Sequence, residues 1–226
     1  STVDLPVSAP AGSVVTVTAT FANSATATTA SAATGTVVLS DGTTQTFALG
    51  DLAAGTSVIR TFTATVPSST ATTVLSATST VASSTPESNT ANNVGTDTLV
   101  VLFADPALDV GVIPSGTPGS TVTTTLSLVN LGSATTSVTV TVLINGVTST
   151  QVFTLPPNGV TQTVVLTVPV TTTGATVSAS ISASSVPDSN LGNNADTSVG
   201  GALFADLSST VDLPVSAPAG SVVTVT

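Results

Sequence analysis

Residues 14–22 read VVTVTATFA, and this stretch decides the fold. In an extended chain Val15, Val17, Ala19 and Phe21 fall on one face, and the threonines between them fall on the other. Strict alternation of apolar and polar side chains is typical of a β-strand with one buried and one solvated face. The stretch therefore predicts a strand of a sheet that packs on one side only.

Similar alternation recurs along the chain between turn residues. In a first unit we predict strands near 2–7, 13–22, 35–40, 43–49, 57–66, 73–82 and 94–104. A second unit repeats them near 107–113, 120–130, 136–144, 147–154, 159–168, 174–184 and 196–205. Units of about 100 residues with seven short strands predict tandem immunoglobulin-like β-sandwiches, and no helical pattern competes with this all-β assignment.

Two further patterns refine the prediction. The fifth strand of each unit places four apolar residues on its inner face: Val58, Phe62, Ala64 and Val66, matched by Val160, Val164, Leu166 and Val168. The dipeptides Asp41-Gly42 and Asn145-Gly146 accept positive φ and predict two-residue hairpin turns. Arg60 falls on the same inner face, but its counterpart Gln162 is uncharged, so we expect a side chain that reaches out from the rim of the core.

An exact repeat sets the domain organisation. Residues 1–18, STVDLPVSAPAGSVVTVT, return letter for letter at 209–226, which is a period of 208 residues. A degenerate half-repeat lies inside it, because Leu102-Phe-Ala-Asp105 returns as Leu203-Phe-Ala-Asp206 at an offset of 101. We therefore predict one sandwich over 1–104, a sister over 105–207, and the start of a third repeat over 208–226.

The composition argues against an enzyme. The chain has no Cys, His, Met, Trp or Tyr, and Arg60 is its single basic residue. Nucleophile–base pairs with His, zinc sites and haem sites need residues that are missing. A catalyst built from carboxylates alone would want an aromatic sugar cleft, and the only aromatic residues are six Phe. We expect no catalytic residues and no cofactor other than calcium.

The charge and hydropathy exclude two classes of partner. A formal charge of −10 disfavours nucleic acid and anionic membrane surfaces, both of which attract basic residues. The mean hydropathy is +0.58, yet the longest strongly apolar stretch is Leu99–Ala104, far below the roughly 20 residues of a spanning helix. We expect no membrane insertion.

One group of polar residues has the chemistry of a cation site. Alternating strand directions place the loop after the sixth strand near the linker between the units. The candidate ligands are Asp105, Asp109, Asp188, Asn190 and Asn193, and oxygen ligands of this kind suit Ca²⁺. The alternative is that these residues only form turns, in which Asn and Asp side chains bond their own backbone.

The order of these motifs resembles the CARDB-type repeat, a cell-adhesion-related bacterial domain. The first unit carries Asp4-Leu5, Gly12, Asn23, Asp41-Gly42, Gly55, Val66-Pro67 and Glu87-x-Asn89-x-x-Asn92-Asn93. The second carries Asp109-Val110, Gly119, Asn130, Asn145-Gly146, Gly159, Val168-Pro169 and Asp188-x-Asn190-x-x-Asn193-Asn194. The resemblance implies tandem immunoglobulin-like modules in a bacterial or archaeal surface protein.

These observations predict a structural protein outside the cell, at its surface or in a matrix. The leading interpretation is a rod or fibre segment, such as the stalk of a giant adhesin or a matrix filament. Its partners would be neighbouring repeats of the same chain, with lateral self-association as a further contact. The alternatives are an adhesive module that recognises a glycan or protein on another surface, and a subunit of a surface layer or sheath. A 208-residue period favours one long covalent array over subunits that exchange strands.

Overall fold

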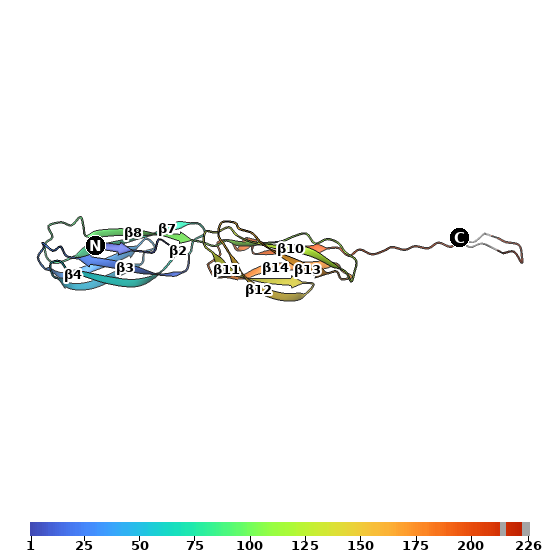
Figure 1. The fold of residues 1–226 in the computed structure, drawn as a ribbon, viewed down its shortest axis with the longest axis horizontal. Helices are drawn as coiled ribbons and strands as arrows, with labels where there is room; N and C mark the ends of the chain where they lie inside the picture. The colour runs from blue at the N-terminus through green and yellow to red at the C-terminus, as the bar shows by residue number, and fades with distance from the viewer. Residues whose placement is uncertain (213–215, 223–226) are drawn as a thin grey trace.

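The computed structural model describes residues 1–212 and 216–222, and it contains two β-sandwiches that lie end to end (Figure 1). No α-helix occurs in this described part of the chain, so the all-β prediction is confirmed. None of its segments is a helix long and apolar enough to cross a membrane. After the second sandwich, residues 203–212 run on as an exposed segment without strands.

The first sandwich consists of eight strands in two sheets. In chain order they are β1 (Thr2–Asp4), β2 (Ser8–Pro10), β3 (Val14–Ala22), β4 (Ala30–Leu39), β5 (Thr44–Leu52), β6 (Ser57–Thr65), β7 (Thr73–Ala82) and β8 (Val94–Leu102). One sheet has the order β1-β3-β6 and the other β2-β8-β7-β4-β5. All neighbours are antiparallel except β2 and β8, which run parallel.

The second sandwich repeats this topology. Its elements are β9 (Pro106–Val110), β10 (Thr121–Asn130), β11 (Thr136–Ile144), β12 (Val147–Leu155), β13 (Gln162–Pro169), β14 (Ala175–Ser184), the 3-10 turn η1 (Leu191–Asn193) and β15 (Ala195–Gly200). The sheets have the orders β13-β10-β9 and β12-β11-β14-β15. A single parallel bridge between Gly116 and Ala202 takes the place of the β2–β8 pairing.

The alternating pattern builds the core as predicted. Val17, Ala19 and Phe21 of β3 are fully buried, and Val15 nearly so. Phe21 is the largest fully buried side chain, and its ring fits because Gly35 on β4 has no Cβ to meet it at 2.4 Å. The two main core clusters draw separately on residues 3–101 and on residues 108–179, so each sandwich has a core of its own.

Several local predictions are wrong. The strand expected near 107–113 ends at Val110, and the strand expected near 35–40 begins at Ala30. The strand expected over 2–7 ends at Asp4, and the chain then crosses to the other sheet as β2; Pro6 lies between them and has no N–H to donate to a ladder. Val160 lies ahead of β13 and is exposed rather than inward. The last strand ends at Gly200, not near 205.

Another wrong prediction concerns a hairpin turn. Asn145-Gly146 is the expected two-residue turn, with φ of 47° and 88° and direct pairing of Ile144 with Val147. Asp41-Gly42 instead lies in a wider loop, where the Asp41 carboxylate accepts a hydrogen bond from Thr43 N at 2.9 Å and only Gly42 has positive φ.

The predicted domain boundaries at 104/105 and 207/208 stay predictions. The strands of the two sandwiches lie within 2–102 and 106–200, which is compatible with them. Part of the predicted third repeat, residues 213–215 and 223–226, lies outside the described residues. Its described residues form no strand.

Candidate functional site

The linker between β8 and β9 is packed into the N-terminal end of the second sandwich. Ala104 is fully buried and clusters with Ala134 and Val186, which come from two different loops. The backbone is held as well, because Ser133 N and Ala134 N donate to the Phe103 carbonyl at 2.9 and 2.8 Å. The two sandwiches are thus joined through a seated linker, not through a free hinge.

Gly132 allows this close approach. A Cβ at this position would lie 2.4 Å from the Phe103 carbonyl oxygen, 2.6 Å from Ala104 Cα and 2.8 Å from Asp105 N. All three are backbone atoms, so no side-chain rotation could relieve the contact. The loop after β10 therefore needs a residue without a side chain where the linker passes.

The Asn-rich loop holds the other side of the linker. Asn193 Nδ2 donates to Asp105 Oδ1 at 2.9 Å, and Asn194 Nδ2 donates to Asp188 Oδ2 at 2.8 Å. The second oxygen of Asp188 accepts from Asn190 N at 2.9 Å, and Asn190 Oδ1 caps η1 by accepting from Gly192 N at 3.2 Å. The loop thus satisfies two carboxylates with N–H donors.

The structure brings together four of the five residues predicted to bind a cation. Asp105, Asp188, Asn190 and Asn193 share this loop and linker, whereas Asp109 is exposed on β9 opposite Ser127. Four residues along a strand place it about 13 Å from Asp105 at 3.3 Å per residue, too far to share one ion. Within the described residues no group of three or more His, Cys, Asp or Glu side chains could hold a metal.

Two atoms at this loop keep the cation hypothesis open. Asn193 Oδ1 and Asn194 Oδ1 are buried and accept no hydrogen bond. Buried oxygens of this kind are normally satisfied by protein, water or an ion. A cation would therefore be held by these two amide oxygens with the neighbouring carboxylates, and calcium binding here stays a prediction.

Sequence analysis missed a pair of structural carboxylates. Asp97 Oδ2 accepts from Leu5 N at 2.7 Å, and Asp196 Oδ2 accepts from Val110 N at 2.8 Å, so each fixes the end of the first strand to the last strand. Both aspartates lie inside a predicted strand of their unit, a location where Asp is depleted. That shared anomaly was the signal available in the sequence.

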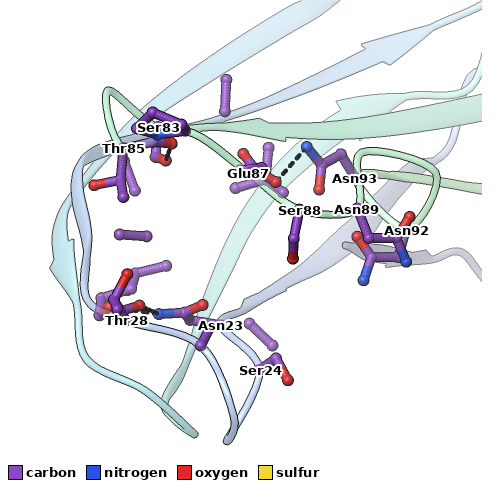
Figure 2. A pocket seen from close by; sticks show the side chains of 18 of the residues that line it. Asn23, Ser24, Thr28, Ser83, Thr85, Glu87, Ser88, Asn89, Asn92 and Asn93 are labelled. Carbon is purple, nitrogen blue, oxygen red and sulfur yellow. Dashed lines mark hydrogen bonds between the residues drawn. The ribbon is translucent and has the colours of Figure 1, made fainter.

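The first sandwich has an open groove at the equivalent end, between residues 23–30 and 83–93 (Figure 2). The same internal bonds shape it: Asn23 Nδ2 donates to Thr28 O at 2.7 Å, and Asn93 Nδ2 donates to Glu87 Oε2 at 2.8 Å. We call this depression the first-sandwich groove. In the second sandwich the linker occupies the corresponding space.

The amino group of Ser1 lies at the rim of the first-sandwich groove. It donates to Asn92 O at 2.7 Å, and Asn92 lines the groove. The chain therefore enters the first sandwich directly beside the groove.

The fold and the repeated loop define the chain as tandem immunoglobulin-like β-sandwich modules. The CARDB family model matches residues 2–97, which make up most of the first sandwich, and the resemblance noted in the sequence is confirmed there. The exact return of residues 1–18 at 209–226 adds a tandem repeat to this match. No curated protein matches it in sequence.

Solved structures similar to this chain at low identity include the following two. A transglutaminase from red sea bream is 13% identical with a TM-score of 0.33, over 88% of this chain and 31% of that one. A tetra-tandem repeat from the extending region of a large adhesion protein is 16% identical with a TM-score of 0.30, over 89% of this chain and 48% of that one. This chain thus spans about a third and about half of those chains, and at such TM-scores neither bears on its function.

Proposed function

We propose that the chain is a segment of an extracellular rod or fibre, and that its task is to supply length and stiffness. The observation that carries the proposal is the seated linker. Ala104 is fully buried against two loops of the second sandwich, and backbone bonds join Phe103 to the loop after β10. Thr72 Oγ1 of the first sandwich also donates to Ser133 Oγ of that loop at 3.1 Å. Because bending at this junction would break those contacts, neighbouring sandwiches resist changes in their relative angle.

The surface chemistry supports a passive, non-enzymatic role outside the cell. With eleven acidic residues and one basic residue, chains repel one another and remain soluble. The core clusters of the two sandwiches contain mainly Val, Leu and Ala. Such a module would display a binding domain at a tip or build a matrix, with neighbouring repeats as its partners.

An adhesive role for each sandwich is the second candidate. The first-sandwich groove is the observation that favours it, since concave sites are where small ligands bind. The groove has no aromatic side chain among its lining residues, whereas sugar sites usually have aromatic walls. We therefore rank this candidate below the rod.

Small-angle X-ray scattering on the chain, together with electron microscopy of longer repeats, tests the rod. The maximum dimension should grow in proportion to the number of repeats, and images should show single straight particles. Flat arrays would favour the surface-layer alternative, and binding to an array of immobilised glycans would favour the adhesive one. A broad distribution of bend angles at the junction would contradict the proposal.

A further inference from the structure

We propose that the first-sandwich groove is the seat of Leu207, contributed by the repeat that precedes it. This inference rests on the proposed array, in which every period of 208 residues is followed by another copy of the first sandwich. It assigns a second kind of junction to the array, distinct from the Ala104 junction. The groove would then bind a residue of the same covalent chain.

The two ends correspond in their hydrogen bonds, although the loop after Asn23 is one residue longer than the loop after Asn130. Asn130 Nδ2 donates to Ala134 O at 2.7 Å just as Asn23 Nδ2 donates to Thr28 O, so Thr28 corresponds to Ala134. In the other loop every residue from Ser83 to Asn93 has its counterpart at an offset of 101, which pairs Thr85 with Val186. Ala134 and Val186 enclose Ala104, whereas Thr28 and Thr85 line the open groove.

Aligning the first strand of each sandwich shows which residue of the preceding linker would lie in the groove. Val110 N bonds Asp196 and Leu5 N bonds Asp97, so Asp4 corresponds to Asp109. The exact repeat makes Asp212 the counterpart of Asp4. Counting back from these aspartates, Leu207 stands at the position of Ala104, and Ser208 stands at the position of Asp105.

The first residue of the first sandwich lies next to the groove. Ser1 is hydrogen-bonded to Asn92, which lines the groove, and Ser209 is the counterpart of Ser1. The two residues before Ser209 therefore begin at the groove rim in any copy that folds as the first sandwich does. Those residues are Leu207 and Ser208.

The groove offers apolar contacts for a leucine side chain. The lining residues are mostly polar, but Ala33, Leu52 and Val81 form an apolar part of the groove, and the equivalent space in the second sandwich receives only a methyl group. Leu207 is 92% exposed in this chain and needs a partner for its apolar surface. A leucine in the open groove would thus take the place that alanine has in the second sandwich.

The polar contact has a counterpart too. Asn193 donates to the Asp105 carboxylate, and Asn92 is its equivalent in the first sandwich. The residue at the Asp105 position is Ser208, whose hydroxyl accepts the same bond without adding a second charge beside Glu87. The motif Leu203-Phe-Ala-Asp206 suggests a rival register with Ala205 in the seat, and the experiment separates the two.

The test is disulfide trapping in a chain of two consecutive periods. The protein has no cysteine, so each engineered pair reports on one contact. Leu207→Cys in the first period with Thr28→Cys in the second should oxidise to a cross-link, since a disulfide needs Cα atoms about 4.4–6.8 Å apart. The matched control is Ala104→Cys with Ala134→Cys, two residues that share the occupied seat.

The outcomes decide between registers. Cross-linking of Leu207→Cys but not of Ala205→Cys supports the proposal. Cross-linking of Ala205→Cys alone, or of the control pair alone, overturns it.

A second measurement is independent of oxidation: Leu207→Asp should broaden the distribution of junction angles in electron micrographs of the two-period chain. The single-period chain should keep its melting temperature with this substitution. An unchanged straight junction with Leu207→Asp would refute the anchor while leaving the rod intact.

Discussion

Replacing Gly132 with alanine should loosen the junction between the sandwiches. The new Cβ would lie 2.4 Å from the Phe103 carbonyl oxygen, so the linker must move by about an ångström to reach normal contact distance. Overpacking of this kind typically costs about 1–3 kcal/mol. The displacement also strains the two hydrogen bonds that Phe103 O accepts at 2.9 and 2.8 Å, each worth about 0.5–1.5 kcal/mol.

The assay is urea unfolding, with scattering as a second readout. Taking about 2 kcal/mol and a slope of about 2 kcal/mol per molar urea, the midpoint of the second sandwich should fall by about 1 M. The radius of gyration should fall, because a junction that bends more freely takes the two sandwiches out of line and shortens the chain's mean end-to-end distance.

Gly201→Ala is the control, since its Cβ would meet only the Ser115 side chain at 3.1 and 3.9 Å, and that side chain can rotate away. An unchanged midpoint and radius in Gly132→Ala would refute the idea that the seated linker stiffens the rod.

Three further predictions concern the core, the structural carboxylates and the cation. Phe21→Ala should destabilise the first sandwich by about 3–5 kcal/mol in urea unfolding, because it removes the largest fully buried side chain; loss below 1 kcal/mol would contradict the assigned core. Asp97→Ala should cost about 1.5–3 kcal/mol by the same measurement, because the Leu5 amide loses a charged acceptor, whereas the exposed Asp4→Ala should change little. Calcium at ten times its dissociation constant should add about 1.4 kcal/mol to the free energy of unfolding and raise the melting temperature by several degrees. Asp188→Asn should remove this response. Equal melting curves in EDTA and in calcium would refute the cation hypothesis.

The strands were predictable because one physical signal dominates them. The ranges 73–82 and 136–144 were predicted with the bounds that β7 and β11 have in the structure. Residues 137–142 alternate strictly between hydroxyl and valine side chains, and packing of one sheet face preserves that alternation. The alternation is broken in 73–82, where the hydroxyl and apolar residues typical of strands supplied the signal. The half-repeat reinforced the prediction, because two divergent copies agreed on the same pattern.

Features set by contacts between distant residues were not predictable in this way. The crossing from β1 to β2 depends on pairing between Ala9 and Val101. A local sequence pattern cannot predict a partner 92 residues away. The bond from Leu5 to Asp97 is equally remote in sequence. Part of the candidate site was predictable, because strand direction placed Asp105 beside the Asn-rich loop. The position of Asp109 was not, because the extended strand β9 carries it away from that loop.

Stiffness in this chain has to come from packing at the junctions, because the sequence offers no covalent alternative. Without cysteine there is no disulfide, and without lysine there is no isopeptide bond between side chains. The first junction is closed by Ala104 and by backbone bonds to Phe103, which requires close approach at Gly132. The second linker is two residues longer between its Leu-Phe-Ala-Asp motif and the aspartate of the next first strand.

Such a linker cannot reproduce the first junction, so an array with both linkers alternates between two junction geometries. The mechanical period is then the full 208 residues and not the single sandwich. A longer linker would be the weaker joint unless a larger side chain anchors it. The leucine at 207, opposite an open groove, is the residue in the right place to do so.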